Sequence, residues 1–136
     1  MAEAVLDGAW PVTAPVMGTT GSLREDLTAW WYTTAEASLR ADTRPIVRAL
    51  IAAVTEHPQA LAAFDALLTH PTREVLQRRI AQAVRDGDCS ADVDSTAFAD
   101  LVIGDLTLLT LGSVELSRAR VEQTVQIVLG PPESTS

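Results

Sequence analysis

The chain has 136 residues, of which 47% are hydrophobic and 21% charged, a balance that excludes a disordered protein and fits a single folded domain. Ten arginines and no lysine stand against eighteen acidic residues, and the net charge of −8 disfavours direct binding to nucleic acid. No apolar run in the sequence approaches the roughly 20 residues of a membrane-spanning helix.

The first 21 residues are predicted to form a short helix followed by a linker. Residues 2–9 carry a brief helical pattern, after which Pro11, Pro15 and Gly18 oppose regular structure. The N-terminus lacks the basic region of a secretory signal peptide, and the single Cys89 cannot form an internal disulfide. We therefore expect a cytoplasmic protein.

Two helices are predicted after this linker. The run Ser22–Glu25 has the spacing of a capping box, in which each of the two polar side chains binds the backbone N–H of the other residue. A helix is therefore expected over 22–40. The next is expected over 44–56, because Pro58 disfavours helical backbone in the residue before it.

Residues 58–86 keep a helical apolar period up to Gly87, but Pro71 lies inside the pattern. Since proline removes a helical hydrogen bond, this segment is either one rod with a bend or two helices that meet near His70. Its basic residues are interleaved with acids and predict a solvated helix face. They are Arg73, Arg78, Arg79 and Arg85.

Two apolar helices are predicted at the end of the chain. Asp94 is placed to cap the first, which runs to Gly112, and Ser117 is placed to cap the second, which ends at Gly130. No alternating strand pattern bounded by turns is found. The expected fold class is all-α, a single helical bundle domain of about five to six helices over residues 22–130.

These last two helices carry more apolar surface than one small domain can cover, which favours pairing with another subunit. The short remainder of the chain, residues 131–136, is expected to be a flexible tail. The predicted dimer interface consists of Phe98, Leu101, Leu106, Leu109, Val121, Val125, Val128 and Leu129.

Catalytic and metal-binding patterns are not found in the sequence. The acidic run 86–94 spaces its oxygen ligands like a calcium loop, but Ala91 stands where the turn needs glycine and Ala97 where a bidentate glutamate is needed. We interpret this run as a helix stop followed by caps. No motif for a nucleophile, a zinc site or a phosphate loop is present, so we expect no metal, no cofactor and no enzyme.

Two features allow a functional interpretation. Asp105 falls inside an apolar arc, where a carboxylate needs a structural partner, access to water or a ligand donor, and the sequence leaves these three open. Trp30, Trp31 and Tyr32 form the densest aromatic patch, and Trp31 is a candidate to line a cavity beside Phe64.

An ordered set of spacings identifies a family resemblance. It comprises the run 20–27, the two prolines Pro58 and Pro71, the run 71–88, and the run 92–106 with its two aspartates at 92 and 94. Over about residues 20–129 the chain resembles the C-terminal ligand-binding and dimerisation domain of tetracycline-repressor (TetR) family transcriptional regulators.

The resemblance implies that the helices at 22–40, 44–56 and 58–86 surround an effector pocket, while the last two helices pair with a second copy as a four-helix bundle. We expect a small hydrophobic or aromatic effector, and no membrane partner. The predicted ligand-binding residues are Leu27, Trp31, Tyr32, Leu50, Phe64, Leu68, Val102 and Asp105.

The DNA-binding helix-turn-helix domain of such regulators is expected to precede this domain, and only residues 1–9 stand where its connecting helix would end. DNA contact is therefore expected only through a domain missing from this sequence. The chain is either a fragment of a regulator or a stand-alone module. The alternative function is a helical dimerisation or protein-interaction module with no small-molecule ligand.

Overall fold

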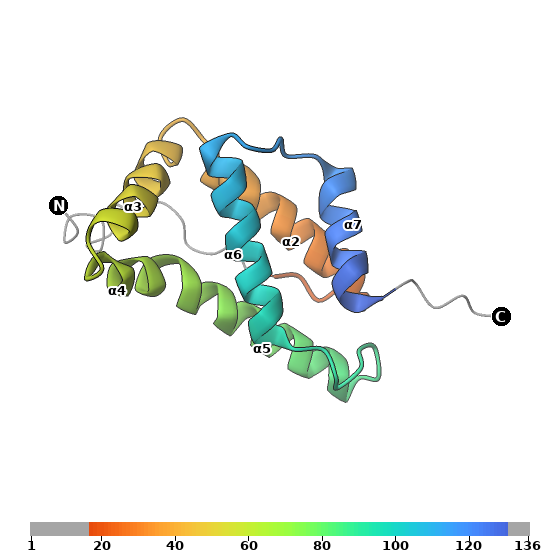
Figure 1. Cartoon of the computed structure of the whole chain (residues 1–136). Coiled ribbons are helices and arrows are strands. Elements are labelled where there is room, and N and C mark those ends of the chain that lie inside the picture. Colours follow the sequence, from red (N-terminus) through yellow and green to blue (C-terminus); the bar gives the residue numbers. More distant parts are fainter. Residues whose placement is uncertain (1–16, 131–136) are drawn as a thin grey trace.

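The computed structural model describes residues 17–130 and shows a bundle of helices (Figure 1). All regular structure in this range is helical, which confirms the predicted all-α class. The segments predicted at 2–9 and 131–136 lie outside the described residues. The elements are α2 (Leu23–Ser38), α3 (Arg44–Glu56), α4 (Ala60–Phe64), the π-helical turn η2 (Asp65–Thr69), α5 (His70–Arg85), α6 (Ser95–Leu111) and α7 (Arg118–Leu129).

Local capping chemistry starts α2, α6 and α7 as the sequence predicted. Ser22, Asp94 and Ser117 each accept a hydrogen bond from a backbone N–H in the first turn of the following helix, at 3.0 to 3.3 Å. Gly112 ends α6 with a φ of 82°, a left-handed conformation that glycine adopts without steric cost. The boundaries of α2, α6 and α7 therefore follow from residues within one turn of each helix end.

Residues 60–85 form one continuous helical rod, which decides between the two alternatives for this segment. The N–H of His70 donates to the carbonyl of Asp65, five residues back, so the helix widens by one residue immediately before Pro71. Pro71 has no N–H to donate to the carbonyl four residues back. The proline is thus accommodated by a π-helical turn and does not break the rod.

The core lies around α2, which packs against α5, α6 and α7 (Figure 1). The ring of Trp31 from α2 lies against that of Phe98 from α6, with centroids 5.8 Å apart and planes tilted by 58°. The loop between α5 and α6 is tied to the start of α2, because the carboxylate of Asp88 accepts the N–H of Leu23 at 2.8 Å. The largest core side chains are Leu23, Leu27, Trp30, Trp31, Leu76, Ile80, Phe98, Val102, Leu106, Leu109, Val121 and Val125.

Helices α3 and α4 lie at the end of the bundle opposite α7 (Figure 1). Only Val47 and Leu50 of α3 are buried, and no residue of α4 is. Neither Val47 nor Leu50 belongs to the main core cluster. Arg44 ties this end to α6, because its Nε donates to the carbonyl of Thr110 at 3.1 Å. The bundle is therefore densely packed around α2 and more loosely packed around α3, α4 and η2.

Candidate functional site

Three of the eight predicted ligand-binding residues lie in the dense core. Leu27, Trp31 and Val102 are fully buried, with no surface accessible to a water molecule. A side chain that lined a cavity large enough for water would keep some accessible surface. The enclosed cavity predicted around these three residues is thus not formed at their positions, because the helices α2 and α6 interdigitate there without a void.

Three other predicted ligand-binding residues lie on the loosely packed end. Leu50 on α3 is buried, while Phe64 of α4 and Leu68 of η2 are only half-buried. Tyr32 is half-buried at the margin of the core cluster. The structure does not bring the eight predicted residues into one site, and it divides them between the core and the end formed by α3, α4 and η2.

Asp105 has a structural partner, one of the three alternatives that the sequence left open. Its Oδ1 accepts hydrogen bonds from Nε and Nη2 of Arg120, at 3.2 and 2.7 Å. The pair joins α6 to α7, with 6% of the Asp105 side chain and 38% of the Arg120 side chain exposed. Oδ2 of Asp105 is buried and has no hydrogen-bond partner among the described residues.

Most of the residues predicted to form the dimer interface are buried in the core of the chain itself. Val128 and Leu129 are half-buried against that core, and only Leu101 stands out into solvent. The prediction that the strongest apolar arcs of α6 and α7 face a partner is wrong in this respect, because α2 and α5 already cover them. The residues buried within the chain are Phe98, Leu106, Leu109, Val121 and Val125.

The surface of α6 and α7 that remains exposed carries other apolar residues. Leu101, Leu108 and Leu111 of α6 are 42%, 42% and 46% exposed, and Ile127 of α7 is 79% exposed. Leu108, Leu111 and Ile127 were not predicted as interface residues. The available signal was the spacing of three and four residues that links Ala97, Leu101, Gly104, Leu108 and Leu111. We call these five residues with Ile127 the outer face.

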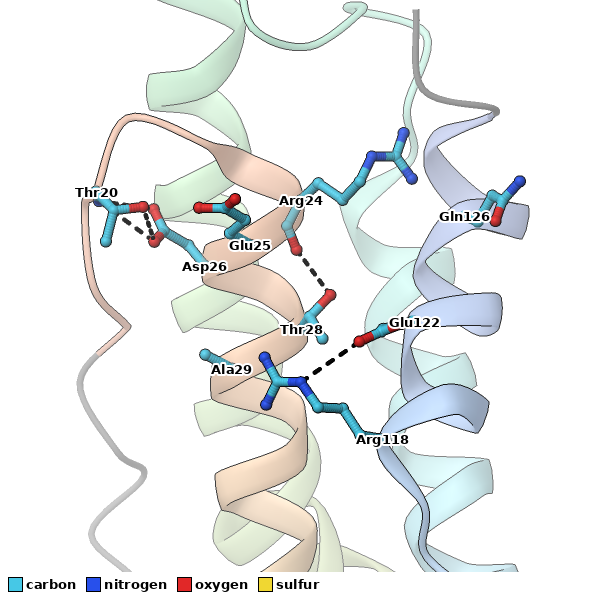
Figure 2. Close-up of a pocket in the computed structure, with 9 residues that line it drawn as sticks. All are labelled: Thr20, Arg24, Glu25, Asp26, Thr28, Ala29, Arg118, Glu122 and Gln126. Carbon is cyan, nitrogen blue, oxygen red and sulfur yellow. Dashed lines mark hydrogen bonds and ion pairs between the residues drawn. The ribbon is translucent and has the colours of Figure 1, made fainter.

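A groove of about 550 Å³ lies between the N-terminal part of α2 and helix α7 (Figure 2). Side chains from the two helices face each other across it, and Nε of Arg118 lies 3.4 Å from Oε1 of Glu122 on α7. Arg24 on its other wall donates to the carbonyl of Gly130 at 2.8 Å. Apart from Ala29, every residue that lines the groove is charged or polar, Glu25 and Gln126 among them. This groove does not have the character expected of a hydrophobic effector site.

Three buried polar groups on α2 have no hydrogen-bond partner among the described residues. They are the indole Nε1 of Trp30, the indole Nε1 of Trp31 and the hydroxyl Oγ1 of Thr34. Buried polar groups are usually paired, so three such groups within about one helical turn are exceptional. The tryptophans were candidates from the sequence and Thr34 was not, because one of three threonines in a helix of mixed polarity carries no signal of its own.

The described part of the chain contains no group of three or more His, Cys, Asp or Glu side chains placed to hold a metal ion. Burial and the nearby carboxylate of Asp88 raise the pKa of the Cys89 thiol, which disfavours the reactive thiolate. Among residues 17–130, no helix is long and apolar enough to cross a membrane.

A protein-family model described as the tetracyclin repressor-like C-terminal domain matches residues 18–128. No curated protein and no solved structure matches the chain at a significant level. The matched range extends from the segment before α2 to the penultimate residue of α7, so that it includes every helix described above. The chain therefore belongs to the family of tetracycline repressor-like C-terminal domains.

Proposed function

We propose that this chain is the homodimerising and effector-sensing domain of a TetR-like transcriptional regulator. Membership of the family supports a regulatory domain and not a catalytic one. The observation that carries the proposal is the outer face, where three leucines of α6 and an isoleucine of α7 stand exposed on helices that the Asp105–Arg120 ion pair joins.

The outer face suits a second copy of the same chain. Contiguous exposed apolar surface on a soluble protein marks an interaction site. Spacings of three and four residues place Leu101, Gly104 and Leu108 along one line of α6, as in helices that pair lengthwise. A two-fold dimer needs only one such self-complementary surface. Two copies of α6 and α7 would then form a four-helix bundle.

Sedimentation velocity over a range of protein concentrations tests this dimer. Leu101→Glu and Leu108→Glu place a charge on the outer face and are expected to give monomer. The matched control is Leu61→Glu, because Leu61 is an equally exposed leucine on α4, away from the outer face. A Leu108→Glu protein that stays dimeric while Leu61→Glu dissociates would remove the outer face as the interface.

The proposed effector site lies where α3, α4 and η2 meet the core. Half-buried apolar side chains gather there, among them Phe64, Leu67 and Leu68. This end contacts α6 through both α3 and η2, so a molecule bound here would touch the helix that carries the outer face. Single π-helical turns frequently occur at functional sites. A small hydrophobic or aromatic molecule fits this lining.

Thermal melting against a panel of small hydrophobic and aromatic compounds tests the effector site. A ligand present at one hundred times its dissociation constant stabilises the folded state by about 2.7 kcal/mol. Phe64→Ala should weaken this effect, whereas Leu61→Ala on the exposed side of α4 should not. The alternative is a pairing module without a ligand, which the closed packing of Leu27, Trp31 and Val102 favours. That alternative predicts a dimer whose melting no compound changes.

DNA contact is assigned to a separate helix-turn-helix domain of the regulator. The net charge of −8 repels the phosphate backbone, and the basic residues of α5 alternate with acids. The chain by itself is expected to show no sequence-specific shift of duplex DNA in a gel assay. A salt-dependent shift with one defined duplex at nanomolar protein would contradict this assignment.

A further inference from the structure

Thr34 differs from the other buried hydroxyl residues of α2. The hydroxyl of Thr28 donates to the carbonyl of Arg24 at 2.8 Å, and that of Ser38 donates to the carbonyl of Thr34 at 3.0 Å. Both use the acceptor four residues back, the usual arrangement within a helix. The hydroxyl of Thr34 makes no such bond and has no partner among the described residues. Its hydrogen-bonding capacity is therefore unused within residues 17–130.

The indole Nε1 of Trp30 is likewise buried without a hydrogen-bond partner among the described residues. Trp30 and Thr34 are four residues apart, so their side chains lie one above the other on the same side of α2. They are 4% and 7% exposed, and neither Nε1 nor Oγ1 has a partner within residues 17–130. Trp31, whose Nε1 is also unpaired, contributes a third donor on the adjoining side, where its ring packs on Phe98. Buried groups of this kind cost free energy until they are paired.

The chemistry of these groups limits what can pair with them. An indole Nε1–H is a donor only, and a hydroxyl donates with its single hydrogen. Residues 30–34 contain no charged side chain. Asp26, one turn before Trp30 on the same side of α2, is already paired with Arg79, so a carboxylate or ammonium ion buried at residues 30–34 would lack a free counter-charge and would be costly to bury. The partner that suits the site is a neutral group that accepts hydrogen bonds.

We propose that Trp30 and Thr34 form the polar end of the effector site and that the effector is an apolar molecule bearing a neutral carbonyl group. The carbonyl oxygen accepts from Nε1 of Trp30 and Oγ1 of Thr34, while the apolar body of the ligand packs among apolar side chains. This inference rests on the proposed effector-binding function. It specifies the chemical class of the ligand, which the family does not.

Two series of probes of matched shape test the inference by isothermal titration calorimetry on the full chain. The aromatic series is 1-acetylnaphthalene, 1-ethylnaphthalene and 1-naphthoate, and the aliphatic series is 2-nonanone, nonane and nonanoate. The ketone of at least one series is expected to bind at least tenfold more tightly than its hydrocarbon and its carboxylate. Carboxylate binding tighter than ketone binding would overturn the neutral-carbonyl assignment.

Substitutions of matched shape locate the donors. Thr34→Val and Trp30→Phe each remove a donor and keep an apolar side chain, so the preference for ketone over hydrocarbon should fall in each and vanish in the double variant. Thr28→Val is the control, because the Thr28 hydroxyl is already bonded within α2. It should leave the preference unchanged.

The free protein provides a readout that needs no ligand. Thr34→Val removes an unpaired buried hydroxyl and should raise the melting temperature, whereas Thr28→Val breaks an existing bond and should lower it. An equal fall of the melting temperature in the two variants would show that the Thr34 hydroxyl is bonded within the chain and would overturn the inference. Equal binding of ketone and hydrocarbon would overturn this inference alone. Absence of binding by all six probes would overturn it together with the effector-binding function.

Discussion

Nη2 of Arg79 on α5 donates to Oδ2 of Asp26 on α2 at 2.7 Å, and only 7% and 2% of these side chains are exposed. The same carboxylate accepts the backbone N–H of Thr20 at 3.0 Å and its hydroxyl at 2.6 Å. This arrangement joins α2, α5 and the segment before α2. Arg79 is thus an exception to the solvated arginine face predicted for α5, because α2 supplies a carboxylate directly opposite it.

Breaking this pair is expected to destabilise the fold strongly. Asp26→Leu or Arg79→Met leaves one buried charge without its partner, which costs about 3–5 kcal/mol. The double variant should cost less than the sum of the two. Urea denaturation of the four proteins gives the coupling energy. The control is Arg73→Met, since its pair with Asp100 is exposed and is worth at most about 1 kcal/mol. Strictly additive losses would exclude coupling between Asp26 and Arg79.

The hydrogen bonds of the Asp26 carboxylate are expected to make the fold less stable in acid. Burial alone raises the pKa of Asp26, but hydrogen bonds from Thr20 and Arg79 and the charge of Arg79 outweigh it, so the pKa lies below its ordinary value. A carboxyl group with a lowered folded-state pKa stabilises the fold above its unfolded pKa of about 3.9, and this stabilisation is lost as the pH falls through the folded pKa.

We therefore expect the free energy of unfolding to fall below about pH 4. The difference in unfolding free energy between the wild type and Asp26→Asn should be constant from pH 7 to about pH 5 and then shrink. Chemical denaturation at a series of pH values measures it. A difference that stays constant down to pH 2.5 would show that Asp26 does not titrate differently in the folded state.

Gly104 provides a test of how closely two copies of α6 approach. A Cβ atom built on Gly104 meets no atom of the chain within 4 Å. In one isolated chain, Gly104→Ala should stabilise α6 by about 0.5–1 kcal/mol, since alanine favours helical backbone. Between two paired helices, the added methyl group should hold them apart and weaken the dimer on the order of tenfold, which equals about 1.4 kcal/mol.

Denaturation of dilute protein and sedimentation equilibrium separate these two effects of Gly104→Ala. Ala97→Gly removes a methyl group from the same line of α6 and is the opposite control. A dimer that tightens in Gly104→Ala would place the helix crossing away from Gly104.

The Asp105–Arg120 pair is expected to respond unequally to the loss of either partner. Arg120→Met leaves the carboxylate of Asp105 buried without a counter-charge, and should cost about 3 kcal/mol or more. Asp105→Asn leaves the guanidinium of Arg120, which reaches water and should cost about 1 kcal/mol. Guanidinium chloride denaturation compares the two variants. Equal losses would mean that both side chains are solvated to the same degree in solution.

The sequence by itself determined where α2, α6 and α7 begin and where α6 ends. Ser22, Asp94 and Ser117 act as caps and Gly112 as a stop, just as their residue types indicate. These signals are readable because a cap depends only on backbone groups within one turn. The family resemblance rests partly on the same residues, Ser22 and Asp94, and the match of the family model confirms it.

Tertiary structure decided what covers each apolar face. Phe98, Val121 and Val125 were predicted to face a partner, and they pack inside the chain. Leu108, Leu111 and Ile127, which their helical patterns did not mark as interface residues, are exposed. Helical periodicity shows which side of a helix avoids water, because that depends on the side chains of one helix alone. Whether the covering surface belongs to the same chain or to a partner depends on how several helices pack together, which the sequence pattern of one helix does not contain.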